Sequence, residues 1–344
     1  MSNTTEESFS DNFSSNSMVY SFDVLQNYVI QQLKKESTTI GSKRPSTLYK
    51  PIEYALSVGG KHIRPVFVLM ACNMFRGNIK QSFPTAIAIE IFHNFTLVHD
   101  DMMDLADIRR NKPTVVKKFG ENIALLSGDS ISILSYEYLL KQKMNNSSDI
   151  LQLFTKSALR VCEGQQYDLD YEEKEVSLQQ YLDMIRLKTA ELIACSLSLG
   201  AILANAPTED VNHMYNFGIN FGQAFQLQDD LMDVYADQNI FGKKTGKDIV
   251  SNKKTFLLIK AMELANSEQK KELAYWIKIK DFEETEKIKA VKQIYNDLNI
   301  KEITRKSIKK YYHKAIIEMD AINVSPDRKK ELILLTGKMI KRKK

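Results

Sequence analysis

The chain has 344 residues, of which 43% are hydrophobic and 26% are charged, and its formal net charge is +5. This composition is typical of a packed globular protein and excludes a fibrous or largely disordered one. No apolar run reaches the roughly 18 to 20 residues that a membrane-spanning helix needs, so we expect no integral membrane segment. The modest charge gives no reason to expect a nucleic-acid partner.

The N-terminus differs in character from the rest of the chain. Residues 1–18, MSNTTEESFSDNFSSNSM, are polar and lack the basic and apolar regions of a secretory signal. We expect a disordered tail at 1–18 and a single domain at 19–344, because no linker interrupts the remainder. Three scattered cysteines indicate neither a disulfide framework nor a Cys-rich metal site, which predicts a reducing, cytoplasmic location.

The periodicity of apolar residues predicts an all-α fold. Glycine and proline are scarce, at 13 and 7, and apolar residues recur at three- and four-residue spacing. An amphipathic helix is expected from Phe22. A break at Gly59-Gly60 precedes a second helix that carries Pro65 near its start, where the missing N–H costs little.

Two long apolar helices are expected at the centre of the fold. Pro84 is expected to open the first, which runs through Leu105 and is apolar on nearly every side. The second is expected from about Asp210 to Asp237. Its Gly218 and Gly222, four residues apart, predict close contact with a neighbouring backbone.

Each of these helices ends in an acidic cluster. The clusters are His99-Asp100-Asp101-Met102-Met103-Asp104 and Gln228-Asp229-Asp230-Leu231-Met232-Asp233. Positions four apart share one face of a helix. Asp100 and Asp104 should therefore point together, and Asp229 and Asp233 should do the same.

Carboxylates on apolar helices favour a cation site, because unpaired charge is unfavourable there. An all-oxygen ligand set without nearby cysteine suits Mg²⁺, which also takes substrate phosphates as ligands. A single cluster is also typical of a solvated helix end. Two copies, each followed by basic residues, favour a magnesium-diphosphate site.

Basic residues follow both clusters. Arg109 and Arg110 lie in the segment Asp107–Thr114, and the segment Phe241–Asp248 precedes Lys253. Guanidinium groups bind anionic oxygens in a bidentate manner, so these segments predict polyanion recognition. The lysine-rich second segment lacks the GxxxxGK[ST] spacing of a nucleotide-binding loop.

Taken together, these residues resemble the trans-isoprenyl diphosphate synthases, the family of farnesyl and geranylgeranyl diphosphate synthases. The resemblance extends from about residue 25 to the C-terminus. It rests on Gly59-Gly60-Lys61-His62-Ile63-Arg64-Pro65, the first cluster with Arg109-Arg110, Ser127-Gly128-Asp129, Lys188-Thr189, and Phe225-Gln226 before the second cluster. It implies a large helical bundle of the isoprenoid synthase type with a central cavity, and a homodimer.

The resemblance also implies roles for individual residues. Three magnesium ions would be ligated by Asp100, Asp104 and Asp229, supported by Asp101, Asp230 and Asp233. Ligands of the allylic diphosphate would be Arg109, Lys188 and Lys243. The isopentenyl diphosphate head group would be bound by Lys61, Arg64, His93 and Arg110. Accessory positions would be Gln165, Asp168, Thr189, Gln226, Asp248 and Lys253. Without the resemblance, His93 is equally typical of a core histidine.

The implied activity is a magnesium-dependent, head-to-tail condensation of an allylic diphosphate (dimethylallyl, geranyl or farnesyl) with isopentenyl diphosphate. Loss of diphosphate leaves an allylic carbocation, which the double bond of isopentenyl diphosphate attacks, and transfer of a proton to the released diphosphate completes the extension. No side-chain nucleophile is needed. Phe95 and Thr96 precede Asp100 by five and four positions, where the growing chain would end. The bulk of Phe95 predicts a short all-trans product of fifteen to twenty carbons.

Three other functions share some of these features. A class I terpene cyclase has the first aspartate motif but normally a mixed second motif, and it would not need Lys61 and Arg64. A non-catalytic regulatory subunit of a prenyl synthase would have damaged motifs, whereas both are intact here. A calcium-binding helical protein would need the ligand spacing of EF-hand loops, which the chain lacks.

Overall fold

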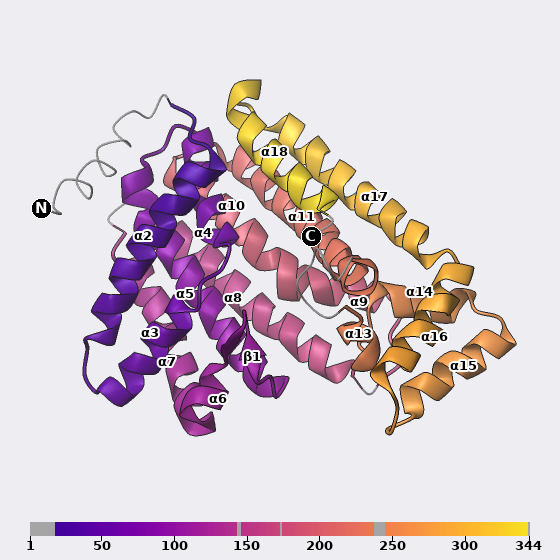
Figure 1. Cartoon of the computed structure of the whole chain (residues 1–344). Helices are drawn as coiled ribbons and strands as arrows, with labels where there is room; N and C mark the ends of the chain where they lie inside the picture. The colour runs from indigo at the N-terminus through magenta and orange to yellow at the C-terminus, as the bar shows by residue number, and fades with distance from the viewer. Residues whose placement is uncertain (1–17, 143–145, 173, 237–244, 343–344) are drawn as a thin grey trace, which may run out of the picture. The chain divides into compact units, whose positions relative to one another are not determined.

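The computed structural model describes residues 18–142, 146–172, 174–236 and 245–342, and nearly all of them lie in helices (Figure 1). The predicted all-α fold is thereby confirmed. The predicted tail lies outside the described residues except for Met18. In the described parts of the chain, no helix is both long and apolar enough to cross a bilayer.

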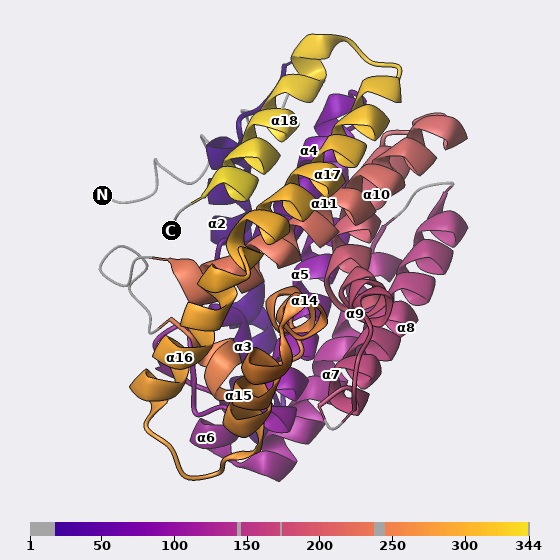
Figure 2. The same cartoon turned by 90° about the vertical axis from the view of Figure 1, so that its right-hand side faces the viewer.

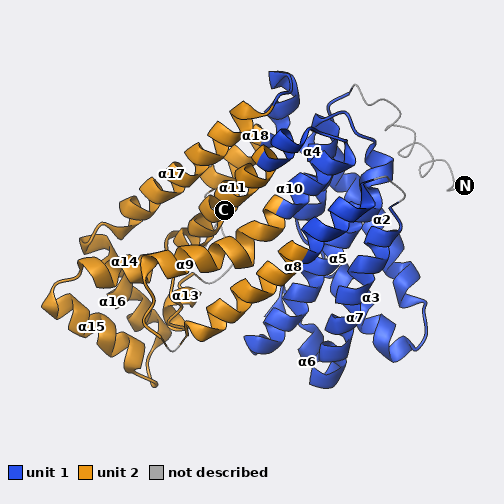
Figure 3. Ribbon diagram, turned by 180° about the vertical axis from the view of Figure 1, so that it is seen from behind, with its two compact units in different colours: residues 1–155, 195–212, 323–332 blue, residues 156–194, 213–322, 333–344 orange. Residues whose placement is uncertain are grey.

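The chain divides into two compact units, coloured blue and orange in Figure 3. Unit 1 comprises residues 1–155, 195–212 and 323–332, and unit 2 comprises residues 156–194, 213–322 and 333–344. Every boundary falls inside a helix except that between residues 322 and 323, which lies in the loop between α17 and α18. The single domain at 19–344 stays a prediction.

Unit 1 is built around one long helix, α5, which packs against α4 and α7, while α2 packs against α3 and α4. Its elements are α2 (Phe22–Gly41), α3 (Ser46–Ser57), α4 (Ile63–Met74), α5 (Ile79–Met103), β1 (Ile108–Arg109), β2 (Lys112–Pro113), α6 (Val115–Phe119), α7 (Glu121–Leu140), the first part of α8 (Ser147–Asp170), the end of α10 (Glu191–Leu203), the start of α11 (Thr208–Tyr235) and the start of α18 (Pro326–Lys341). The two short strands pair as an antiparallel hairpin. The helix predicted from Phe22 and the break before Pro65 are confirmed.

The bounds of α5 differ from the prediction. The helix begins at Ile79 because the side chain of Asn78 accepts a hydrogen bond from the Gln81 N–H and caps the free end. Pro84 therefore lies inside α5 rather than at its start. The helix ends at Met103, since Leu105 has a φ of 49°, which no helical residue adopts. As predicted, α5 is buried on nearly all sides.

Unit 2 holds the remaining elements, and within it α14 packs against α9, α16 and α17. They are the rest of α8, α9 (Leu178–Ile185), the π-helical turn η2 (Arg186–Ala190), the start of α10 (Glu191–Leu203), most of α11 (Thr208–Tyr235), α13 (Lys247–Val250), α14 (Phe256–Leu264), α15 (Ser267–Lys278), α16 (Glu284–Asp297), α17 (Ile300–Ala321) and the end of α18 (Pro326–Lys341). Figure 2 shows α14 and α16 beside α17.

The predicted close contact of α11 with a neighbour is confirmed in unit 2. A Cβ atom at Gly218 would lie 2.4 Å from Cα of Ala194, and one at Gly222 would lie 2.5 Å from Cα of Ala190. Both distances are shorter than van der Waals contact. The backbone of α11 therefore lies against η2 and the start of α10, where only glycine fits.

Candidate active site

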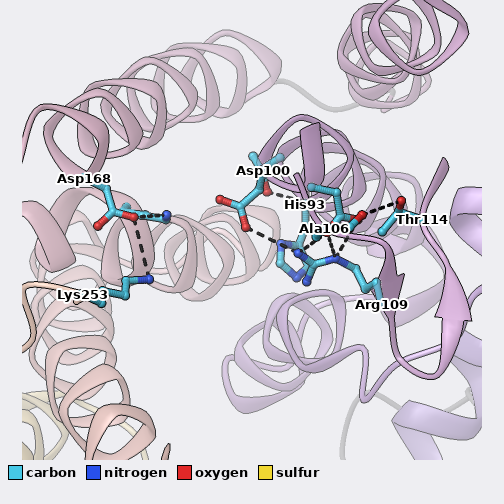
Figure 4. A network of polar contacts seen from close by, with 10 residues as sticks. His93, Asp100, Ala106, Arg109, Thr114, Asp168 and Lys253 are labelled. Carbon is cyan, nitrogen blue, oxygen red and sulfur yellow. Dashed lines mark hydrogen bonds and ion pairs between the residues drawn. The ribbon is translucent and has the colours of Figure 1, made fainter. Parts of the chain in front are cut away.

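The first aspartate motif lies at the C-terminal end of α5, with Asp104 as the capping residue. Arg109 on β1 donates from Nε to both carboxylate oxygens of Asp101, at 2.8 and 2.9 Å. Its Nη2 also donates to Oδ2 of Asp100 at 3.5 Å. Figure 4 shows Arg109 reaching toward Asp100. The motif and its guanidinium group are thus brought together within unit 1.

The hairpin that carries Arg109 is held by local hydrogen bonds. The Thr114 hydroxyl donates to the Ala106 carbonyl at 2.8 Å, as Figure 4 shows. Asp101 is buried, and burial raises the pKa of its carboxyl group, which the guanidinium only partly offsets. Arg109 therefore stabilises an ionised carboxylate in a place that disfavours it.

A second basic cluster forms where α4 meets α5. Nη1 of Arg64 donates to Nε2 of His93 at 3.1 Å. Burial, together with the nearby arginines, lowers the pKa of His93 well below its usual value, so the neutral ring can accept this bond. Burial also lowers the pKa of Arg64, to about 10. Arg64 and His93, two of the residues expected at one substrate pocket, are thus in direct contact.

Arg110 and Lys61 lie at the loop before α4. A Cβ atom at Gly60 would lie 2.6 Å from Nη1 of Arg110, so glycine lets the hairpin approach this loop. Gln26 donates to the Lys61 carbonyl at 2.7 Å, and the Lys61 side chain is exposed. Arg64, His93 and Arg110 therefore gather in unit 1, with Lys61 at the adjoining surface.

The second aspartate motif, on α11 in unit 2, is held differently. The buried Asp230 accepts hydrogen bonds from the Tyr181 hydroxyl and from Nε2 of Gln226, the latter at 2.9 Å. The Thr189 hydroxyl in turn donates to Oε1 of Gln226 at 2.9 Å. Burial raises the pKa of Asp230 despite these donors. Uncharged hydrogen-bond donors thus provide most of the local stabilisation of Asp230.

The other two carboxylates of this motif have different partners. Asp229 accepts a hydrogen bond from Arg342, whose guanidinium lies 4.4 Å from the centre of the Phe225 ring. Asp233 accepts one from the backbone N–H of Asp248 at 3.0 Å. Burial, together with the neighbouring aspartates, raises the pKa of Asp248 to about 7. Acidic groups therefore crowd together at this end of α11.

Lys188 and Lys253 converge on Asp168 in unit 2. Their Nζ atoms lie 2.5 and 3.9 Å from Oδ2 of Asp168, and Figure 4 shows Lys253 pointing toward it. The residues line a small cavity of about 40 Å³ together with Tyr181, Thr189, Gln226 and Asp230. Gln165 lies on the same helix as Asp168, α8.

An aromatic row precedes the first aspartate motif on α5. The ring of Phe95 lies 5.3 Å from that of Phe92 and 4.8 Å from that of His99. The Thr96 hydroxyl donates to the backbone carbonyl of His93 at 2.8 Å. The bulky side chain expected at this position is therefore locked among other rings.

Some predicted residues fall outside the described chain, and others escaped prediction. Lys243 lies outside the described residues, as does the rest of the segment Phe241–Asp248 before Thr245. Sequence reasoning missed Tyr181 and Arg342 as partners of the second motif. Only the apolar helical pattern around Tyr181 and the basic C-terminal run hinted at a role for either residue.

The donor set fits Mg²⁺. Among the residues that the structure describes, no three His, Cys, Asp or Glu side chains form a group able to enclose an ion. Magnesium typically keeps several waters and takes one or two carboxylates plus substrate phosphates, so it needs no such enclosure. The crowded, oxygen-only carboxylates at Asp230, Asp233 and Asp248 are donors of the kind it prefers.

Comparisons with known proteins agree on one family. The family model described as polyprenyl synthetase matches residues 45–297. A short chain isoprenyl diphosphate synthase of Methanocaldococcus jannaschii is 36% identical over 246 residues, 71% of this chain and 75% of that protein. A geranylgeranyl pyrophosphate synthase of Geoglobus acetivorans is 34% identical over 308 residues, 88% and 92% of the two chains. A crystal structure of a geranylgeranyl pyrophosphate synthase superposes with a TM-score of 0.89 at 37% identity, covering 94% of this chain and all of that one.

Proposed function

Because the chain belongs to the polyprenyl synthetase family, we propose that it is a short-chain trans-prenyltransferase, which condenses an allylic diphosphate head-to-tail with isopentenyl diphosphate. The observation that carries the proposal is that both aspartate motifs have cationic side chains beside them. Arg109 bonds to the first, and Lys188 and Lys253 line one small cavity with Asp230 of the second. Carboxylates and cations in one place suit a metal-bound diphosphate.

We propose Mg²⁺ as the cofactor, with three ions held by the aspartates of both motifs. The proposed ligands are Asp100, Asp104, Asp229, Asp230 and Asp233, with Asp101 in support. When bound, the ions withdraw electron density from the diphosphate and make it a better leaving group. The aspartate side chains would hold the bound ions in place, and Arg109 favours the ionised form of Asp101.

The basic side chains divide between the two substrates. Arg109, Lys188 and Lys243 would bind the allylic diphosphate and stabilise the negative charge that develops as it leaves. Arg64, His93 and Arg110, with Lys61, would bind the head group of isopentenyl diphosphate. The Arg64–His93 hydrogen bond supports this, because it holds the guanidinium in place before any substrate arrives. Thr189, Gln226 and Lys253 would have accessory roles.

We further propose that Phe95 and Thr96 limit the product to fifteen to twenty carbons. The packing of Phe95 between Phe92 and His99 supports this, because a ring held on two sides cannot easily move away from a growing chain. Two relatives, 38% identical over 229 and 224 residues, are named geranylgeranyl diphosphate synthases, whose product has twenty carbons.

A homodimer and a cytoplasmic location complete the proposal. On α7, Leu126, Ile133 and Leu140 are 58, 70 and 68% exposed at seven-residue spacing, so they share one face. An exposed apolar stripe of this kind marks an interaction surface. Light scattering should give a molecular mass twice that of the chain, and Ile133→Glu should lower the measured mass toward that of one chain.

The function is tested by incubating the purified chain with magnesium, dimethylallyl diphosphate and labelled isopentenyl diphosphate. We expect labelled prenyl diphosphates of fifteen to twenty carbons, and no product after chelation by EDTA. A terpene cyclase would instead release hydrocarbon from an allylic diphosphate alone. A regulatory subunit would release nothing, and either result contradicts the proposal.

A further inference from the structure

The segment that carries Lys188 and Thr189 is not an ordinary α-helix. Between α9 and α10, η2 forms a π-helical turn in which the Glu191 N–H donates to the carbonyl of Arg186, five residues back. Such turns are rare and occur mostly as single bulges at functional sites. The extra residue turns the helix face before it by about 100° relative to the face after it.

The turn sets the directions of two candidate ligands. Lys188 points to Asp168, with Nζ 2.5 Å from Oδ2, and the Thr189 hydroxyl bonds Gln226 at 2.9 Å. If η2 relaxed to a regular α-helix, either α9 or α10 would rotate by about 100° and these side chains would lose their partners. The geometry of this part of unit 2 therefore depends on the bulge.

Glycine residues on α8 and α11 leave room for the backbone of η2. A Cβ atom at Gly164 on α8 would lie 2.2 Å from the backbone nitrogen of Lys188. One at Gly222 on α11 would lie 2.5 Å from Cα of Ala190. The backbone of η2 is thus packed directly against the backbones of α8 and α11, which leaves it no space to shift.

The side chain of Glu191, the residue that closes the turn, is anchored on both of these helices. It is 0% exposed, and its carboxylate accepts hydrogen bonds from the Ser157 hydroxyl at 2.9 Å, Nη1 of Arg160 at 3.2 Å and the Tyr215 hydroxyl at 2.7 Å. A buried carboxylate is tolerated only when it is paired and hydrogen-bonded in this way. Neither Glu191 nor its partners belong to the proposed substrate ligands.

We propose that Glu191 is a positioning residue: its carboxylate, tied to α8 and α11, holds η2 in register so that Lys188 faces the allylic diphosphate. The inference rests on the proposed function, because it takes Lys188 as a ligand of that substrate. Glu191 does not touch substrate, and it acts through Lys188. Its loss should therefore impair use of the allylic diphosphate more than use of isopentenyl diphosphate.

The test compares Glu191→Gln with Glu163→Gln, an exposed glutamate on α8. The amide keeps the size of Glu191, but its nitrogen cannot accept hydrogen bonds from Arg160 or Tyr215. We expect the KM for the allylic diphosphate to rise about tenfold or more, since small misplacements of binding groups can cost up to about 100-fold. The KM for isopentenyl diphosphate and the kinetics of Glu163→Gln should stay within about twofold.

A double-mutant cycle with Lys188→Ala separates positioning from general stability. If Glu191 acts through Lys188, the KM of the double mutant for the allylic diphosphate should equal that of Lys188→Ala alone. If the two substitutions raised this KM by independent factors that multiply in the double mutant, the proposal would be overturned. Unchanged kinetics of a folded Glu191→Gln protein would overturn it too. Should circular dichroism show that this variant does not fold, Tyr215→Phe, which removes one donor, carries the same cycle.

Failure of the inference and failure of the proposed function are distinguishable. If the wild-type chain makes no prenyl product, the proposed function fails. Binding of inorganic pyrophosphate with magnesium, measured by calorimetry, then tests Glu191 alone. Weaker binding in both Glu191→Gln and Lys188→Ala supports the positioning role, and weaker binding in Lys188→Ala only contradicts it.

Discussion

In the first aspartate motif, Asp101 pairs with Arg109, eight residues further along the chain, whereas the corresponding Asp230 of the second motif is held by two neutral side chains. Of these, Tyr181 lies 49 residues away. Burial raises the pKa of both aspartates. The second aspartate of the DDxxD spacing is thus bonded to a charged group in unit 1 and to neutral hydrogen-bond donors in unit 2.

A DDxxD motif therefore specifies its ligand atoms but not the side chains that hold them. A guanidinium group both neutralises and orients Asp101. The Tyr181 hydroxyl and the Gln226 amide orient Asp230 while leaving its negative charge available. We infer that Asp230 depends more on bound cations than Asp101. Four sets of substitutions test how far the two motifs differ.

The largest effect is expected from neutralising the first aspartate of each motif. Asp100→Asn and Asp229→Asn should each lower kcat/KM about 1000-fold, because removing one preorganised electrostatic group costs about 100- to 1000-fold. Steady-state kinetics at saturating magnesium measures this, with the exposed Asp281→Asn as control. A small loss in only one variant would show that the two motifs do not share one role.

Removing the guanidinium should destabilise unit 1. Arg109→Met keeps the aliphatic stem but leaves Asp101, whose side chain is 5% exposed, without its cation. Breaking a buried pair costs about 3 kcal/mol, so the free energy of unfolding should fall by about that amount. Urea denaturation measures it. A loss below about 1 kcal/mol would mean that water, rather than Arg109, stabilises Asp101.

Removing the neutral donor should have a smaller effect. Tyr181→Phe deletes one hydrogen bond to a buried carboxylate, which is worth about 1.5 kcal/mol. The same denaturation experiment applies, with Tyr275→Phe, exposed on α15, as the matched control. Added magnesium should recover more stability in Tyr181→Phe than in Arg109→Met. The reverse order would overturn the distinction between the two motifs.

The smallest effect on rate is expected from the residue five positions before each motif. This residue is Phe95 before the first and the buried Ala224 before the second. Phe95→Ala should lengthen the product by one or more five-carbon units and change the rate by less than about tenfold, because no charged group is lost. Chromatography of the labelled products decides this. A folded variant with an unchanged product profile would assign Phe95 to packing alone.

Much of the fold follows from local patterns. The three- and four-residue spacing predicts the helices because burial of one face stabilises them. Gly218 and Gly222 predict a close neighbour, although not that it is Ala190 and Ala194. Pro84 was misleading as a helix start, since the cap at Asn78 determines where α5 begins.

Contacts within the candidate site were predictable where the two residues in contact are close together in the sequence. Arg109 follows Asp101 closely enough for a short hairpin to join them. The π-helical turn leaves no mark in the apolar pattern, because it changes backbone hydrogen bonds rather than side-chain character. The contacts of Asp230 with Tyr181 and of Asp229 with Arg342 depend on tertiary packing between distant segments.

The 113 residues that separate Asp229 from Arg342 matter during protein synthesis. A nascent chain grows by about 5–20 residues per second, so Arg109 is made within about two seconds of Asp101. Arg342 follows Asp229 only after about 6 to 23 s. Premature termination or C-terminal proteolysis would therefore remove the partner of Asp229 and leave the first motif complete.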